Sequence, residues 1–276
     1  MKLQFLGTAA AEGIPGIFCQ CAVCQEARRK GGRFIRTRSQ ALIDDRLLID
    51  LNADTYLHTL RYGIELSRIA SVLITHAHSD HLYPAEIGMR KTGFAMFDEK
   101  SSPILTVYGS DKVREKIESV LQTPKINTVF REVRPFETFE VEGYTVTALP
   151  ARHDPKAGPL FYLIEKDGKS ILYGHDTGFY FDEVWDWFRE KGKRLSLVSM
   201  DCTEGDKQIG YDSHGNVERD VAMQKKMLDE KIADENTLFV MNHFSHNGGK
   251  VAYDTFVPIA AGHGFLVSYD GMEIEL

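Results

Sequence analysis

A seven-residue segment, Thr-His-Ala-His-Ser-Asp-His at positions 75–81, directly follows an apolar run at positions 69–74. Such a run is typical of a buried strand, so four potential metal ligands stand at the end of one strand. Alternation along an extended chain directs His76 and His78 to the same side, while Asp80 and His81 follow in the turn. Neutral imidazole and carboxylate are ligands of first-row divalent metals. The segment therefore predicts a strand end that serves two neighbouring metal ions, and a polar loop with histidines clustered by chance is the alternative.

Further candidate ligands occur downstream and upstream of this segment. Four carboxylate or imidazole side chains come at the ends of other predicted strands, namely Asp50, His153, Asp176 and His243. Taken alone, such a histidine is more often a core or loop residue with its hydrogen bonds satisfied. Only the shared order with the first segment makes these residues candidates.

Short strand-like segments and helical segments follow one another irregularly along the chain. Strand patterns occur at residues 3–6, 41–43, 47–49, 71–74, 104–108, 144–149, 161–164, 170–173, 195–200, 238–241, 265–269 and 272–274. Turn signals accompany them at Glu142-Gly143, Asp167-Gly168 and Asp270-Gly271, so we expect hairpins to dominate both halves. Helical periodicity occurs at residues 54–61, 111–121, 182–190 and 217–228. This order favours an α/β fold built as an αβ/βα sandwich, with two mixed β-sheets and helices on the outer faces.

The ordered ligands resemble the motifs of the metallo-β-lactamase superfamily, in which an early Asp is followed by His-x-His-x-Asp-His and then by His, Asp and His. The resemblance covers essentially the whole chain and implies the sandwich fold. It implies that one metal is bound by His76, His78 and His153. It also implies that Asp80, His81 and His243 bind the second metal, with Asp176 between the two and Asp80 also taking part in catalysis. Asp50 would then support the histidine segment through hydrogen bonds.

Two divalent ions held in this way favour hydrolysis. Ions about 3.5 to 4 Å apart can hold a hydroxide between them and neutralise charge that develops on a phosphoryl or carbonyl oxygen. Five imidazoles and two carboxylates suit zinc and manganese, and iron is a further candidate. The sequence therefore predicts a metal-dependent hydrolase without naming its metal.

A second, cysteine-rich site is expected at about residues 19–24. Cys19, Cys21 and Cys24 provide three soft ligands, which is one too few for a closed tetrahedral zinc. We expect His246 to complete a structural zinc site, because it follows His243 by three residues and can point away from the catalytic pair. Cys202 is the alternative fourth ligand or a buried small hydrophobe, and three free thiols in a loop are the alternative to a site.

Several segments resemble one branch of the superfamily, the phosphoribosyl cyclic phosphodiesterases associated with phosphonate breakdown. They are the Cys-x-Cys-x-x-Cys loop, the opening at 7–15, the Arg-Thr-Arg-Ser element at 36–39 and the ending at 270–274. The resemblance implies a small phosphodiester substrate with a five-membered cyclic phosphate on ribose. It also implies that His214 is a general acid for the leaving oxygen, whereas the sequence alone equally allows a neighbour of a helix start.

Length and charge limit the partners of the chain. The 276 residues are 43% hydrophobic, no linker or repeat is evident, and we expect one domain over residues 1–276. No run of 18 apolar residues occurs, and residues 1–7 read as a first strand, so a cytoplasmic location without a membrane partner is expected. The net charge of −7 argues against long nucleic acid as a partner. A homodimer is left open.

Basic residues gather near the N-terminus, at Arg28, Arg29, Lys30, Arg33, Arg36 and Arg38. A solvated loop face is expected for most of them, although such a cluster could also hold phosphate. Arg36 and Arg38 are the candidates for substrate contact, because they adjoin a predicted strand.

Three other functions share the same ligand pattern. A tRNA 3′-end endonuclease has the same metal motif, but the acidic chain shows no long basic insertion to clamp RNA. A lactonase or thioesterase is an alternative because the same hydroxide attacks acyl carbon. An accessory protein of quinone-cofactor biosynthesis resembles this chain in its cysteine-rich loop.

Overall fold

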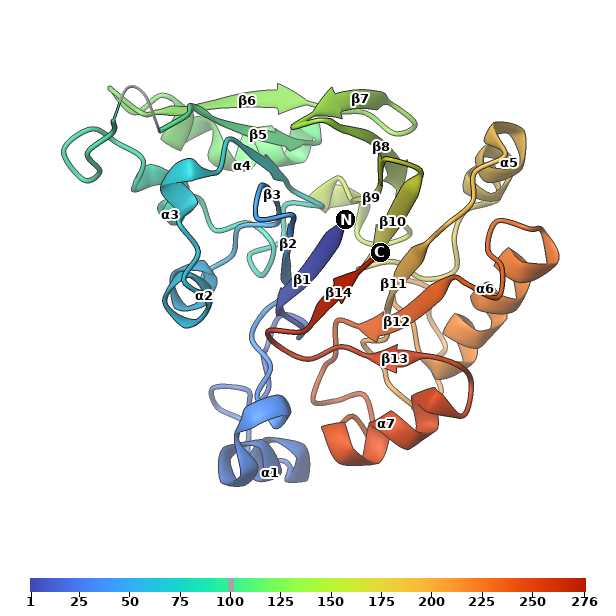
Figure 1. Ribbon diagram of the computed structural model, residues 1–276. Coiled ribbons are helices and arrows are strands. Elements are labelled where there is room, and N and C mark those ends of the chain that lie inside the picture. The colour runs from blue at the N-terminus through green and yellow to red at the C-terminus, as the bar shows by residue number, and fades with distance from the viewer. Residues whose placement is uncertain (99–101) are drawn as a thin grey trace.

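Strands buried on both faces build two mixed sheets in the computed structural model, which describes residues 1–98 and 102–276 (Figure 1). The first sheet runs in the order β14 (Glu273–Glu275), β1 (Lys2–Gly7), β2 (Gln40–Ile43), β3 (Leu47–Ile49), β4 (Ser71–Leu73), β5 (Leu105–Gly109) and β6 (Thr128–Glu132). Its pairs from β14 to β3 are antiparallel, and its pairs from β3 to β6 are parallel.

The second sheet has the same number of strands and the same division. Its order is β13 (Leu266–Val267), β12 (Leu238–Asn242), β11 (Leu197–Asp201), β10 (Lys169–Gly174), β9 (Leu160–Lys166), β8 (Tyr144–Pro150) and β7 (Thr138–Val141). Pairs from β7 to β10 are antiparallel hairpins, and pairs from β10 to β13 are parallel.

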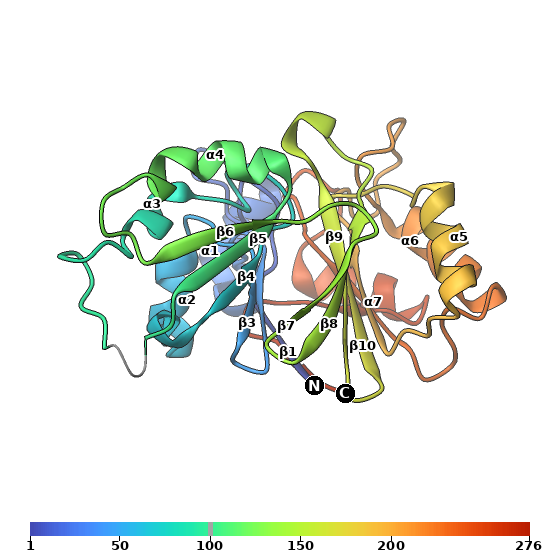
Figure 2. The same cartoon turned by 90° about the horizontal axis from the view of Figure 1, so that it is seen from above.

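Helices cover the outer faces of both sheets, as Figure 2 shows from above. The first sheet carries α2 (Thr55–Tyr62), α3 (Pro84–Gly88) and α4 (Asp111–Leu121), and the second carries α5 (Asp182–Lys191), α6 (Val217–Asp229) and α7 (Tyr253–Ala261). Helix α1 (Ala22–Lys30) lies apart, below the sheets in Figure 1. Short 3-10 turns occur at Gly32–Phe34, Leu66–Arg68 and Pro155–Ala157. The predicted αβ/βα sandwich is therefore confirmed.

Residue alternation divides the core into layers. Along β3, Leu47 and Ile49 pack between the two sheets, whereas Leu48 packs under the outer helices. Strand β10 repeats this pattern on the other sheet, with Ile171 and Tyr173 inside and Leu172 outside. Because both faces are covered, central strands such as β3 and β10 have continuous apolar runs, whereas the edge strands β7 and β14 alternate exposed polar and buried apolar residues.

The expectation that hairpins dominate both halves is wrong for half of each sheet, where the strands are parallel. The turns Glu142-Gly143 and Asp167-Gly168 do close hairpins, but Asp270-Gly271 joins β13 to β14, which belong to different sheets. Five further elements were not predicted from the sequence pattern, namely β6, β7, α1, α3 and α7. Pro258 interrupts the pattern of α7, and α1 is dominated by polar residues, so neither gives a clear helical signal.

Strands of both sheets end at a common edge of the sandwich, and these ends carry the predicted ligands. Strands β3, β4, β8, β10 and β12 are followed by Asp50, the 75–81 segment, His153, Asp176 and His243 respectively. In the described ranges, 1–98 and 102–276, no helix is both long and apolar enough to cross a membrane.

The buried interface between the sheets generates a stability prediction. Leu73 is fully buried there, and we expect Leu73→Ala to lower the free energy of unfolding by about 3 kcal/mol through lost burial and a cavity. Leu60, on α2, is 67% exposed, so Leu60→Ala should change the free energy of unfolding by less than about 0.5 kcal/mol. Urea unfolding of both variants measures the difference, and equal losses would contradict this layered core.

Candidate metal centre

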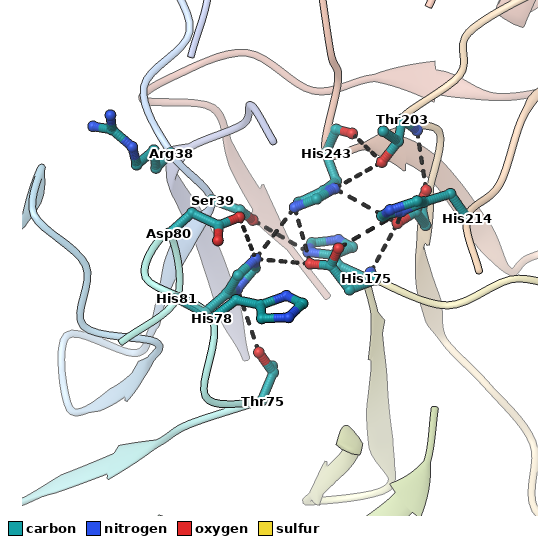
Figure 3. Close-up of polar contacts among 12 residues, drawn as sticks. Arg38, Ser39, Thr75, His78, Asp80, His81, His175, Thr203, His214 and His243 are labelled. Atoms are coloured by element: carbon teal, nitrogen blue, oxygen red, sulfur yellow. Dashed lines mark hydrogen bonds and ion pairs between the residues drawn. The ribbon is translucent and has the colours of Figure 1, made fainter. Parts of the chain in front are cut away.

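Three strand-end residues turn the backbone sharply at the centre. Asp50, Asp176 and His243 have φ values of 64°, 49° and 62°, in the left-handed region that non-glycine residues rarely adopt. Such a conformation costs on the order of 1 kcal/mol or more at each residue and persists only where neighbours hold it. All three side chains are buried, and Figure 3 shows His243 among the polar side chains of the centre.

Three histidines form the first group of the centre. Nδ1 of His78 lies 3.0 Å from Nε2 of His76 and 3.2 Å from Nε2 of His153. Ligands around a tetrahedral zinc with bonds of 2.0–2.1 Å would be separated by about 3.3 Å. The three nitrogens therefore have the spacing of ligands around one ion.

Two histidines and two carboxylates form the second group. Nε2 of His81 lies 3.3 Å from Nε2 of His243, 3.2 Å from Oδ2 of Asp80 and 2.7 Å from Oδ2 of Asp176. Asp176 also reaches the first group, because its Oδ1 lies 3.6 Å from Nε2 of His153. The structure thus places Asp176 between the two groups, as the bridging interpretation requires.

Hydrogen bonds behind His76 and His81 fix which ring nitrogen carries the proton. Nδ1 of His81 lies 2.7 Å from the Asp50 carboxylate, which can only accept. The Thr75 hydroxyl donates to Asp50 and therefore accepts from Nδ1 of His76, at 3.0 Å. When either ring is neutral, its Nε2 is left with a lone pair directed into the centre.

The same logic applies to the other two strand-end histidines. Thr203 Oγ1 donates to the carbonyl of His243, so it accepts from Nδ1 of His243 at 2.8 Å. Nδ1 of His153 faces the carbonyl oxygen of Ser213 at 3.2 Å. When neutral, each ring again directs an unprotonated Nε2 inward. Sequence analysis did not single out the two threonines or Ser213.

This donor set fits cations. Imidazole nitrogens from five histidines approach one another at 3.0–3.3 Å, and the buried Oδ2 of Asp176 has no hydrogen-bond partner. Four carboxylates surround the group, at Asp50, Asp80, Asp176 and Asp201. Within residues 1–98 and 102–276, their ion pairs are with histidines alone. Bound divalent cations would neutralise this excess of negative charge.

The pKa values of the buried groups reflect the same excess of negative charge. Burial by itself would lower the pKa of His81, but the carboxylates of Asp80, Asp50 and Asp176 outweigh burial and raise it well above its usual range. Burial would raise the pKa of Asp80, yet the neighbouring His81 holds it below its usual range. The centre thus favours positive charge among its carboxylates.

Asp201 is a residue of the site that was not predicted from the sequence. It ends β11, accepts from the backbone nitrogens of Asp176, Thr203 and Gly215, and lies 3.2 Å from Nδ1 of His214. Burial would lower the pKa of His214, but Asp201 outweighs burial and raises it to about 9. An acidic residue directly after a buried strand, as at Asp50, is the signal that could have identified it.

The cysteine-rich group assembles at the start of α1. Nδ1 of His246 lies 3.6 Å from Sγ of Cys19 and 3.7 Å from Sγ of Cys21, and all four ligand atoms, Cys24 included, lie within 4.8 Å of one another. Sulfur and nitrogen ligands of one tetrahedral zinc would be about 3.6 Å apart. Cys202 is buried behind the second sheet's helices and is not part of this group. The expectation for His246 therefore matches the geometry.

Arg36 does not have the position expected of a substrate contact. Its side chain is 2% exposed, its Nη1 donates to Thr8 Oγ1 and to the Ser268 carbonyl, and its guanidinium stacks 4.2 Å from the Phe244 ring. The prediction that Arg36 contacts substrate is therefore wrong. Its position beside a strand places its side chain in the core. Arg38 remains a candidate at the edge of the site, although Figure 3 shows its guanidinium directed away from the histidines. It pairs with Asp54 at 2.8 Å.

The other basic residues of the cluster serve mainly the local structure. Arg28 donates to the carbonyls of Cys19 and Gly16 and so braces the cysteine loop. Arg29 and Lys30 pair with Glu26 on the same helix. Arg28, Arg29, Lys30 and Arg33 are exposed, as expected of a solvated face, but they lie on α1 and the turn that follows it.

Comparison with known proteins gives a consistent set of relatives. A family model described as a beta-lactamase superfamily domain matches residues 45–232. The chain is similar to ribonuclease Z of Listeria innocua, with 25% identity over 266 residues that cover 91% of this chain and 78% of the relative. A second ribonuclease Z, from Listeria monocytogenes, is 26% identical over 79% of this chain and 67% of its own length.

Solved structures share the fold over the whole chain. A diphosphatase from the PhnP family superposes with a TM-score of 0.77 at 20% identity, covering 100% of this chain and 97% of that one. Zinc-bound PqqB from Methylobacterium extorquens gives 0.72 at 17% identity and full coverage of both chains. The short form of human tRNase Z gives 0.68 at 17% identity, covering 100% and 99%. These identities establish a common fold.

The cysteine-rich group generates a metal-binding prediction. We expect Cys21→Ser to lose one zinc per chain and to melt about 5 °C lower, because the metal holds the loop to His246. Cys202→Ala is the matched control, since Cys202 lies outside the group. Elemental analysis and thermal melts measure both. Zinc content unchanged in Cys21→Ser would exclude the site.

Proposed function

The chain belongs to the metallo-β-lactamase superfamily and is a metal-dependent hydrolase, and from this premise we propose that it is a dinuclear phosphodiesterase. The observation that carries the proposal is the convergence of imidazole nitrogens in two adjacent groups with Asp176 between them. His76, His78 and His153 would hold one divalent ion, and the second group would hold the other. Zinc or manganese suits this donor set, with iron a further candidate.

The chemistry of such a pair suits phosphate esters. Two divalent ions, when bound, lower the pKa of a water and neutralise negative charge that develops on a phosphoryl oxygen. The protein's part is to keep the ligand rings in one orientation, which Asp50, Thr75 and Thr203 do through hydrogen bonds to the outer ring nitrogens. The relatives' names point the same way, because ribonuclease Z and the diphosphatase both act on phosphate linkages.

His214 is our proposed general acid for the leaving oxygen. Its Nδ1 donates to Asp201, and its side chain is 19% exposed, so the ring is oriented while still open to a substrate. Its ring centre lies 4.9 Å from that of His153, which places it at the rim of the first group. A proton on Nε2 of His214 would be the one transferred.

We propose a small cyclic phosphodiester on ribose as the substrate. Support comes from the resemblance of the cysteine loop and of the chain's opening and ending to the phosphoribosyl cyclic phosphodiesterases, and from the full-length fold match to a PhnP-family diphosphatase. The place of such a substrate is phosphonate metabolism, and a cytoplasmic location would fit it.

Cleavage of RNA is the second candidate, and the curated ribonuclease Z relatives favour it. The net charge of −7 weakens it, because phosphate-rich duplex RNA is bound through an excess of Lys and Arg. Acyl hydrolysis uses the same ions and is the third candidate.

A substrate comparison tests the proposal. The metal-loaded protein is incubated with 5-phosphoribosyl 1,2-cyclic phosphate, a 2′,3′-cyclic nucleotide, a linear phosphodiester and a precursor tRNA, and phosphorus NMR or gel electrophoresis follows each. We expect preferential opening of the ribosyl cyclic phosphate. Preferential tRNA cleavage would support the nuclease instead, and activity on acyl substrates alone would overturn a phosphodiesterase. His76→Ala should reduce turnover at least about 1000-fold, with exposed His263→Ala as the control.

The role of His214 predicts a dependence on the leaving group. With a poor leaving group such as a ribose alkoxide, we expect His214→Gln to lower kcat by about 100- to 10,000-fold. With 4-nitrophenolate, which needs no proton, the loss should be less than about tenfold. A uniform loss on both substrates would indicate that His214 only supports the ligands.

A further inference from the structure

A buried chain of hydrogen bonds runs from the β13–β14 turn to the back of the metal centre. Asp270 Oδ2 lies 2.7 Å from Thr37 Oγ1, which lies 2.7 Å from Nε2 of His58. Nδ1 of His58 lies 2.5 Å from Oε1 of Gln40, and Nε2 of Gln40 donates to the backbone carbonyl of Asp50 at 2.9 Å. His58 and Gln40 are completely buried, and the Asp270 side chain is 4% exposed. Sequence analysis gave none of these side chains a function.

The proton positions along the chain follow from its Asp50 end. A backbone carbonyl can only accept, so the nitrogen of the Gln40 amide must face Asp50 and its oxygen must face His58. Nδ1 of His58 therefore carries a proton. A neutral imidazole has only one, which leaves a lone pair on Nε2 facing Thr37.

Thr37 has one hydroxyl proton for two neighbours. If that proton goes to Nε2 of His58, then Thr37 Oγ1 and Asp270 Oδ2 meet at 2.7 Å with no proton unless the carboxyl itself donates. If the proton goes to Asp270 instead, His58 must be a doubly protonated imidazolium. Either way, the chain of bonds holds one proton more than a neutral imidazole and an ionised carboxylate provide.

Of the two carboxyl oxygens of Asp270, Oδ2 is the one that faces the Thr37 hydroxyl, where that proton is needed. The Thr37 backbone N–H also donates to Oδ2 at 2.7 Å, so a protonated Oδ2 must accept this bond while it donates to Thr37 Oγ1. The Thr8 hydroxyl accepts from Arg36 Nη1 at 2.9 Å and donates to Asp270 Oδ1 at 2.7 Å. Oδ1 is therefore an acceptor, and the bond to Thr37 is made by Oδ2.

Burial decides between the two arrangements, because it disfavours charge on either group. Burial lowers the pKa of His58 to about 4 and raises the pKa of Asp270 above its usual range. Charged or titratable side chains also face the pair. For His58 they are Asp54 and Arg61, and for Asp270 they are Arg36, Arg61 and Tyr62. Arg61, at 3.5 Å, and Arg36 favour an ionised Asp270, but neither removes the mismatch at Thr37.

We propose that Asp270 is protonated and that Asp270, Thr37 and neutral His58 form a positioning relay for the metal centre. The relay holds Gln40, which anchors the Asp50 backbone, and the Asp50 carboxylate holds Nδ1 of His81. His58 is therefore a positioning residue that acts through Asp50. Its effect on metal binding rests on the proposed ligand role of His81, whereas its protonation state does not.

Nitrogen-15 and carbon-13 NMR of the zinc-loaded protein at pH 7 tests the proton assignment. We expect His58 to show a protonated Nδ1 and an unprotonated Nε2, and Asp270 to show the carboxyl shift of the acid form. His58→Gln assigns the imidazole signals. An imidazolium, a neutral ring with the proton on Nε2, or an ionised Asp270 overturns the assignment. This measurement uses the unaltered chain, so a variant that fails to fold does not affect it.

Metal titration tests the positioning role. Thr37→Val removes the hydroxyl at nearly constant volume, and we expect about tenfold weaker binding of manganese, at the lower end of losses seen for residues behind metal ligands. Thr37→Ser keeps the hydroxyl and should restore affinity and the His58 signals. His263→Gln, at an exposed site, is the control and should bind like the unaltered protein.

The outcomes separate this inference from the proposed function. A folded Thr37→Val variant that keeps manganese affinity within twofold overturns the positioning role. Unaltered protein that binds no manganese or zinc at all overturns the dinuclear centre instead, and the NMR assignment of Asp270 and His58 is then judged on the metal-free chain.

Discussion

Mutual repulsion among buried acceptors is the constraint on which this structure depends. Imidazole nitrogens and carboxylate oxygens converge within about 3 Å at the edge where the two sheets meet. Asp176 Oδ2 forms no hydrogen bond there, although Nε2 of His81 and of His243 lie 2.7 and 3.0 Å away. A buried anionic group of this kind is costly without compensating cations, so the fold must hold it rigidly until they bind.

Rigidity comes from the fold in two ways. The ligands sit directly at strand ends, where parallel pairing fixes the backbone, and several adopt left-handed conformations that only dense surroundings keep. Behind them, Asp50, Thr75 and Thr203 form hydrogen bonds to the outer ring nitrogens of the histidines. The Asp201 carboxylate accepts hydrogen bonds from the backbone N–H groups of Asp176 and Gly215. The centre is thus a property of the packed sandwich and not of one segment.

Much of the centre was predictable because its candidate ligands directly follow strands and occur in the order of a known motif. The 75–81 segment, His153, Asp176 and His243 needed only strand periodicity and the order of a known motif. Arg36 was misjudged because sequence pattern does not distinguish an arginine beside a pocket from one buried against Phe244. The weakly periodic α7 and the crossing of β13 to β14 between sheets were missed for a similar reason, since packing partners distant in the chain decide them.

The sequence by itself determined the two-sheet sandwich, the types and order of the candidate ligands, and the separate cysteine group. These features depend on strand and helix patterns and on residue types, which can be recognised within short segments. Only the tertiary structure decided that His246 and not Cys202 joins the cysteines, that Arg36 is buried, and that Asp201 stands behind His214. It alone shows the chain of bonds from Asp270 to Asp50. Proton positions in that chain depend on which donor contacts which acceptor. Tertiary packing decides these contacts, because the residues involved are distant in sequence.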